Sequence, residues 1–117
     1  MHLEDRQIAM ARIGRALADP TRGRILLAIL DGVRYPAELA EQLGLSRTNV
    51  SNHLACLRGC GLVLATPQGR QVRYQLSSGA LSHALTDLLG IVLAVTEADD
   101  CESPRAGVRR VVAGAGP

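Results

Sequence analysis

The chain has 117 residues, a formal net charge of +2 and 47% hydrophobic residues, which include two Tyr but no Phe or Trp. This length predicts one domain with a small aliphatic core, and such a core favours further burial against a second subunit. The scarcity of aromatic side chains argues against a protein that binds single-stranded nucleic acid, because the bases of such a ligand stack on aromatic rings.

The first ten residues, MHLEDRQIAM, are polar and charged and do not resemble a secretory signal. No apolar run of the chain is long enough to form a transmembrane helix. We therefore expect a cytoplasmic protein that does not bind membranes. In that compartment the three cysteines are thiols or metal ligands rather than disulfides.

The first half of the chain carries the signals of helix starts and ends. Asp19 and Pro20 start a helix, because Asp caps a helix and Pro fits its first position. Pro36 starts a shorter helix that Gly44 ends, and Ser46 caps the helix that follows. The predicted helices cover residues 4–18, 20–30, 36–43 and 47–59.

In the second half of the chain the spacing of apolar residues changes from a helical to a strand period. Residues 62–66 and 71–76 have the pattern of strands, and the four residues between them form a predicted loop with Gly and Arg at its tip. A last helix is predicted over residues 78–96. The chain is then acidic and afterwards rich in Gly, Pro, Ala and Arg, so that we expect a flexible C-terminal tail at 97–117, beyond a folded domain at 1–96.

This order of elements is a mainly α fold with a small β-hairpin, a winged helix-turn-helix of order α-α-α-α-β-β-α. Val50, Leu54 and Leu57 form the buried face of its second motif helix, and small polar residues occupy the opposite face. Residues 42–76 contain four Arg and no Asp or Glu, which suits a duplex DNA surface. The predicted DNA-binding residues are Ser46, Arg47, Thr48, Asn49, Ser51, Asn52, His53, Arg70 and Arg73.

Three segments resemble the ArsR/SmtB family of metal-responsive repressors. They are ALADPTRGRILLAIL at 16–30, the segment that begins at Leu39 and carries SxxNVSNHLxxLR, and GLVLATPQGRQVRYQL at 61–76. The resemblance implies a symmetric homodimer built from the first and last helices, which binds double-stranded operator DNA and is released by a metal ion. The last helix agrees, because its apolar residues step by four and three as in a coiled coil. These residues are Leu81, Leu85, Leu88, Val92 and Val95.

Two metal sites that are common in this family lack their ligands in this sequence. The stretch before the third helix, which carries a Cys-x-Cys in some members, reads Val33-Arg34-Tyr35. The last helix offers only His83 and Asp87, whereas the positions expected to hold its other ligands read Ser78, Ala80 and Ile91. A metal site therefore has to use other residues, and the cysteines remain.

Cys56 and Cys60 are four residues apart on the fourth helix, so that both thiolates lie on one face and can hold one soft ion. This pattern is similar to the cadmium and lead sensors of the family, and the resemblance implies Cys101 of the tail as a third ligand. The expected effector is cadmium or lead, with zinc and arsenite as further candidates. Metal captured there would tie the end of the DNA-reading helix to the tail.

Three alternatives stay open. The cysteines could form a thiol-redox switch, the effector could be arsenite, or the chain could be an architectural DNA-binding protein without an effector. An enzyme is not expected, because the sequence has no Ser/His/Asp or Cys/His constellation, nucleotide loop or paired acidic site.

Overall fold

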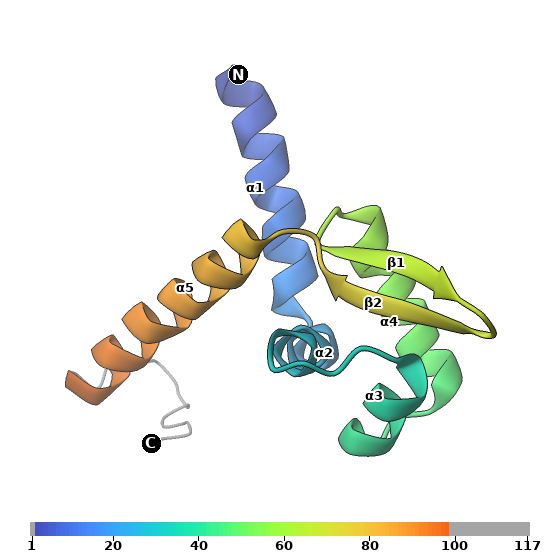
Figure 1. The fold of residues 1–117 in the computed structure, drawn as a ribbon. Coiled ribbons are helices and arrows are strands. Elements are labelled where there is room, and N and C mark those ends of the chain that lie inside the picture. The colour runs from blue at the N-terminus through green and yellow to red at the C-terminus, as the bar shows by residue number, and fades with distance from the viewer. Residues whose placement is uncertain (1, 99–117) are drawn as a thin grey trace. The chain divides into compact units, whose positions relative to one another are not determined.

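The structure, a computed structural model, describes residues 2–98, with side chains described to residue 95. It forms two compact units, which divide between Leu81 and Ser82. The predicted order of five helices and a hairpin is confirmed within these residues (Figure 1). The elements are α1 (Leu3–Ala18), α2 (Pro20–Leu30), α3 (Pro36–Leu43), α4 (Arg47–Gly59), β1 (Val63–Gln68), β2 (Gln71–Leu76) and α5 (Gly79–Ala98). Residues 99–117, which make up most of the predicted tail, lie outside the described residues.

The junction of α1 and α2 is fixed by hydrogen bonds from both directions. The Asp19 carboxylate caps α2 by accepting a hydrogen bond of 2.9 Å from the backbone N–H of Arg22. The guanidinium of Arg22 in turn donates to the carbonyls of Arg15 and Ala16, at 2.9 and 3.0 Å. These carbonyls belong to the last turn of α1, where no intrahelical partner is available to them. One cap and one arginine therefore hold the angle between the two helices.

The helix-turn-helix, α3 to α4, begins and ends at the predicted residues. Pro36 occupies the first turn of α3, and Gly44 ends it with a left-handed φ of 68°, a conformation that costs other residues energy. The Ser46 hydroxyl accepts a hydrogen bond of 3.0 Å from the N–H of Asn49 and so caps α4. Arg24 of α2 donates to the carbonyl of Leu43 at 2.7 Å, which ties α2 to the turn.

The hairpin differs from the prediction at its tip. We expected a loop over 67–70, but β1 continues through Gln68, and only Gly69 and Arg70 form the turn. Pro67 is tolerated inside the strand because of the register. Tyr74 donates its N–H outside the hairpin, so its pair with Ala65 is one without ladder hydrogen bonds, and the same holds two positions on for Pro67 and Val72. The missing N–H of proline is thus not needed there.

The loop between α2 and α3 is joined to the hairpin by two hydrogen bonds. The N–H of Tyr74 donates to the carbonyl of Arg34 at 2.8 Å. The hydroxyl of Tyr35 donates to Oε1 of Gln68, also at 2.8 Å, next to the turn. Both hydrogen bonds join residues far apart in sequence, so they fix the position of the wing relative to the helix-turn-helix.

The core is aliphatic, as the composition predicted. Its largest fully buried side chains come from α2, α3, α4 and β1, and the hairpin lies beside α4 (Figure 1). They are Ile25, Ile29, Leu39, Leu54, Leu57, Val50 and Val63. This core places the exposed faces of α4 and the hairpin on one surface of the unit.

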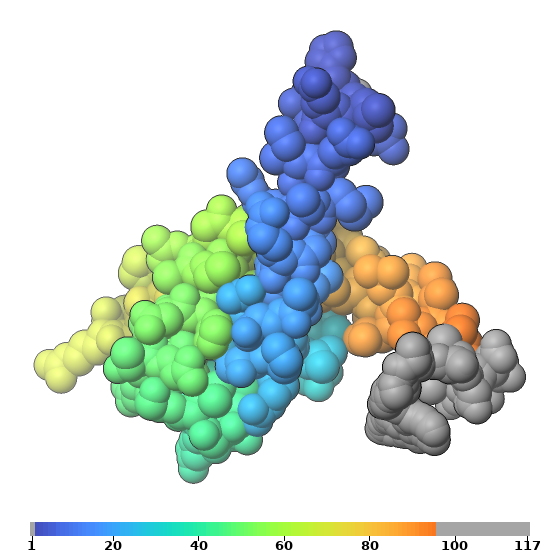
Figure 2. Space-filling model, turned by 180° about the vertical axis from the view of Figure 1, so that it is seen from behind, coloured from blue at the N-terminus to red at the C-terminus, as the bar shows by residue number. Residues whose placement is uncertain are grey.

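Helices α1 and α5 carry apolar side chains that remain exposed. In α1, Leu3 is 66% and Met10 70% exposed. The N-terminal half of this helix extends beyond the other elements of its unit (Figure 2). In α5, Ile91 is 62% and Leu93 59% exposed. Among the described residues, no helix is both long and apolar enough to cross a membrane.

Candidate nucleic-acid interface and cysteine pair

Helix α4 has the two faces that its sequence predicted. Val50, Leu54 and Leu57 are buried against the core. The side chains proposed for DNA lie on the outside, where their hydroxyl, amide and guanidinium groups are open to solvent. The exposed members of this set are Ser46, Arg47, Thr48, Asn49, Ser51 and Asn52. The α4 N-terminus adds free backbone N–H groups, which favour a phosphate.

His53 differs from the other predicted contacts because it is half-buried. It faces Asp19, at the start of α2. The pKa of the Asp19 carboxyl lies below its ordinary value of 3.8, chiefly because the carboxylate accepts the N–H of Arg22. Partial loss of hydration raises this pKa, whereas electrostatic attraction to Arg22 and His53 lowers it, and the net shift is downward. His53 of α4 thus interacts electrostatically with the residue that caps α2.

The two arginines of the wing also differ from each other. Arg70 lies in the turn of the hairpin and is exposed. Arg73 is half-buried, and its guanidinium donates to Oε1 of Gln75 on the same strand at 2.5 Å. Arg70 is therefore the more accessible of the two for a phosphate.

The cysteine pair lies at the C-terminal end of α4. Cys56 is exposed and Cys60 is half-buried, and both are free thiols. The N–H of Cys60, the C-cap residue, donates to the carbonyl of Cys56 at 3.0 Å, so the two residues lie one helical turn apart. Cys101 lies outside the described residues. Among residues 2–98, no three His, Cys, Asp or Glu side chains are grouped as a metal site.

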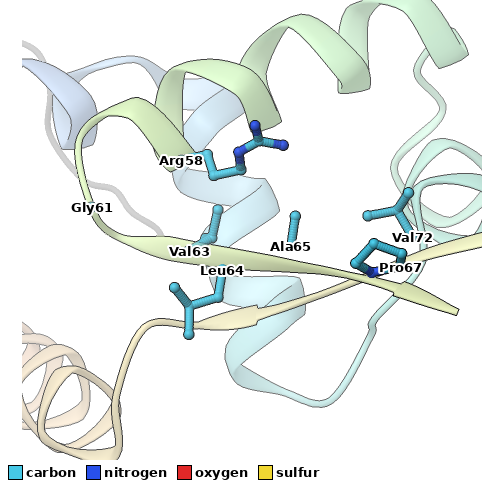
Figure 3. A pocket seen from close by; sticks show the side chains of 7 residues that line it. All are labelled: Arg58, Gly61, Val63, Leu64, Ala65, Pro67 and Val72. Carbon is cyan, nitrogen blue, oxygen red and sulfur yellow. The ribbon is translucent and has the colours of Figure 1, made fainter.

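A groove lies between α4 and the hairpin, with a volume of about 530 Å³. Its floor is apolar, because side chains of both strands point from the hairpin toward α4 (Figure 3). These side chains are Val63, Ala65, Pro67 and Val72. Arg58 extends from α4 over this floor and is exposed. Arg58 was not among the site residues predicted from the sequence. The helical wheel could have indicated it, because Arg58 lies on the same side of α4 as Arg47 and Ser51.

Comparison with known proteins identifies the family. The family model of the bacterial regulatory proteins of the arsR family matches residues 19–64. The transcriptional regulator CmtR of Mycobacterium tuberculosis is 62% identical over 103 residues, which cover 88% of this chain and 87% of CmtR. A protein of Streptomyces lividans named "Probable mercury resistance operon repressor" is 50% identical over 66 residues, 56% of this chain and 53% of that protein.

The fold agrees with that of a solved relative. The NMR structure of the cadmium metal-sensor CMTR from Mycobacterium tuberculosis matches with a TM-score of 0.61 and 63% sequence identity, over 81% of this chain and 99% of that one. The family resemblance expected from residues 16–76 is thus confirmed. With its helix-turn-helix and wing, the chain belongs to the arsR family of bacterial regulatory proteins and is a transcriptional regulator.

Proposed function

We propose that a homodimer of this chain represses transcription by binding double-stranded operator DNA, and that it leaves the DNA when cadmium, or a metal ion of similar softness such as lead, binds its thiolates. The observation that carries the proposal is the placement of two free thiols, Cys56 and Cys60, on the helix that reads DNA. The identity of 62% with CmtR of Mycobacterium tuberculosis, whose NMR structure is described as that of a cadmium metal-sensor, supports the same metal.

DNA binding is assigned to α4 and the wing. The exposed small polar residues of α4, with Ser51 and Asn52 at their centre, can donate to and accept from base edges in the major groove. Arg70 at the wing turn supplies a cation for the backbone or the minor groove. Because residues 42–76 contain no Asp or Glu, nothing within this segment repels the phosphates.

The dimer is assigned to α1 and α5. Their exposed apolar side chains make up surfaces larger than single scattered residues, and such surfaces mark interaction sites. In α5 the exposed Leu88, Val92 and Val95 lie on the seam with coiled-coil spacing. A second copy of the chain offers the same helices, and most oligomers of one chain are symmetric.

The metal site is assigned to Cys56, Cys60 and Cys101. Two thiolates one turn apart leave a soft ion short of ligands, and Cys101 supplies the third sulfur. Asp99, Asp100 and Glu102 flank Cys101 in the sequence, and their charges attract a cation to the tail. Thiolates are the soft ligands that such ions prefer, so the donor set fits cadmium and lead better than hard oxygen-seeking ions.

The switch follows from the side of α4 that carries the cysteines. Asn49, His53, Cys56 and Cys60 lie on one stripe of the helix. A metal ion bound there would tie the end of this stripe to the tail and would shift α4 relative to α2, against the electrostatic attraction between His53 and the Asp19 carboxylate. A change of only about 3 kcal/mol between the two poses lowers DNA affinity by roughly 100-fold.

The test is a DNA-binding titration with cadmium, lead, zinc and arsenite side by side. The probe is a duplex selected from a random library by the metal-free protein. We expect Cys56→Ser and Cys60→Ser to bind this DNA but to lose their response to metal. Cys101→Ser should respond only at much higher cadmium or lead, because two thiolates remain. Ser103→Ala, a matched change in the tail, should respond like the wild-type chain.

Ultraviolet absorption of the cadmium–thiolate bonds counts the sulfurs in the same samples. An unchanged absorption and metal response in Cys101→Ser would remove the tail from the site. Release of DNA by peroxide in the absence of metal would favour a thiol-redox switch. DNA affinity that neither metal nor oxidant changes would favour an architectural protein.

A further inference from the structure

The groove between α4 and the hairpin has the chemistry of a phosphate site rather than of a purely apolar pocket. Its floor is apolar, whereas its upper wall carries the guanidinium of Arg58 (Figure 3). Within the described part of the chain, this guanidinium has no hydrogen-bond or ion-pair partner. An arginine that is exposed, uncompensated and placed over a cleft is available to an anionic ligand.

The groove lies on the side of α4 away from the cysteines. Each residue of an α-helix turns the side chain by about 100°, so Arg58 is rotated by about 200° from Cys56 and from Cys60. It therefore lies on nearly the opposite side of the helix from both cysteines. By the same count Arg47 and Ser51 lie within about 20° of Arg58. These three residues form a stripe along the wing-facing side of α4. The metal site and the groove are therefore separate surfaces of one helix.

The geometry of duplex DNA indicates what fills such a groove. The major and minor grooves of DNA are separated by one sugar–phosphate strand. If α4 lies in the major groove and the wing turn at Arg70 reaches the adjacent minor groove, this strand has to pass between them. We infer that the groove between α4 and the hairpin binds a segment of the DNA backbone, with Arg58 as a phosphate-binding residue. The inference rests on the DNA binding assigned to α4 and the wing under the proposed function.

The groove residues fit this ligand. The guanidinium can form two parallel hydrogen bonds to phosphate oxygens. Pro67 and Val72 at the far end of the floor offer apolar surface to the carbon face of a deoxyribose. The absence of Asp and Glu from residues 42–76 leaves the charge of Arg58 uncompensated within this segment. This contact would position the protein on DNA and carry no sequence information of its own.

The first test is the salt dependence of DNA binding by Arg58→Ala. Because each lost phosphate contact reduces the slope of log K against log salt by about 0.9, a dimer should lose roughly 2 from the slope. Selected and unrelated duplexes should weaken by the same factor. Arg6→Ala, the matched loss of an exposed arginine from α1, should keep the wild-type slope. Equal slopes for Arg58→Ala and the wild-type chain would overturn the inference.

The second test has a first readout on the wild-type protein, which does not depend on the folding of a variant. Neutral methylphosphonate linkages are placed one at a time along the selected duplex. The wild-type protein should lose affinity at a phosphate between the contacted major and minor grooves of each half-site. Arg58→Ala and Arg58→Gln should bind that modified duplex as well as the unmodified one. A wild-type protein that is indifferent to every linkage in this region would contradict the inference.

Metal response separates this inference from the proposed function. Arg58→Ala should keep the cadmium–thiolate absorption and the release by cadmium, because Arg58 lies away from the cysteines. Loss of the cadmium response with an unchanged salt slope would mean that the C-terminal tail occupies the groove, and would overturn the assignment to DNA. A wild-type chain that selects no duplex at all would refute the proposed function itself, whatever Arg58 does.

Discussion

The winged helix-turn-helix and the two helices α1 and α5 differ in how far their apolar side chains are exposed to solvent. In the first region, Ile25 and Leu39 are 0% exposed. In α1 and α5, Leu3 is 66% and Leu88 52% exposed. The first region therefore buries most of its large hydrophobic side chains within one chain, with Leu27, Leu64 and Val72 as exposed exceptions. The second leaves apolar surface exposed that the proposed dimer would bury, so its contribution to stability should depend on protein concentration.

A charge placed in the core of the winged helix-turn-helix should have the largest effect on stability. Leu54→Asp puts a carboxylate into a fully buried site without a partner, which costs at least several kcal/mol, out of a total stability of roughly 5–15 kcal/mol. We expect the variant to be unfolded at every protein concentration, as measured by circular dichroism. A folded Leu54→Asp would show that this core is not the main source of stability.

The equivalent change in α5 should have a smaller effect of a different kind. The side chain of Leu88 is open to water in one chain and buried only in the proposed dimer, so Leu88→Asp should weaken dimerisation by about 3 kcal/mol. Leu85→Asp should act in the same direction. Analytical ultracentrifugation should show monomers, while His83→Asp, on the other side of α5, should remain dimeric. Intact dimers of both leucine variants would move the interface elsewhere.

Loss of a helix cap tests the first region at a smaller scale. Ser46→Ala removes the hydroxyl that accepts the N–H of Asn49, and should lower the free energy of unfolding by about 1 kcal/mol. Ser51→Ala is the matched control, because Ser51 is exposed on the same helix and is not a cap residue. Chemical denaturation measures both. Equal stabilities of the two variants would show that the cap of α4 does not matter.

The smallest expected effect is a change in the pH dependence of stability. The pKa of Asp19 is lowered in the folded chain, so ionised Asp19 stabilises the fold above its unfolded pKa. This contribution is lost as the pH falls below 3.8 and through the folded pKa. Asp19→Asn should keep the cap but flatten this acid dependence, whereas Asp19→Ala should also lose stability at neutral pH. An unchanged acid limb in Asp19→Asn would contradict the role of its charge.

The helices could be predicted from the sequence because their ends are determined locally. Pro36 and Gly44 give the bounds of α3, and Ser46 gives the start of α4, through conformations and hydrogen bonds that need no distant partner. The turn of the wing was placed wrongly because the sequence signal of Pro67 suggested a loop. Whether proline fits a strand depends on which pairs of the ladder lack hydrogen bonds, and that is a property of the register.

The site could be predicted only in part for a similar reason. The exposed face of α4 follows from helical periodicity, and so does the cysteine pair. The half-burial of His53 beside Asp19 and the position of Arg58 over the hairpin depend on how distant elements pack. No local pattern reports those contacts. The third ligand, Cys101, stays a prediction, since it lies outside the described residues.

The two hydrogen bonds that join the α2–α3 loop to the wing have a spectroscopic consequence. The chain has two tyrosines and no tryptophan or phenylalanine, and Tyr35 and Tyr74 each take part in one of these two hydrogen bonds. The aromatic absorption, fluorescence and near-ultraviolet circular dichroism of the protein therefore come from one place. An unlabelled sample reports the attachment of the wing directly, so its emission can be followed through a DNA or metal titration without attaching a dye.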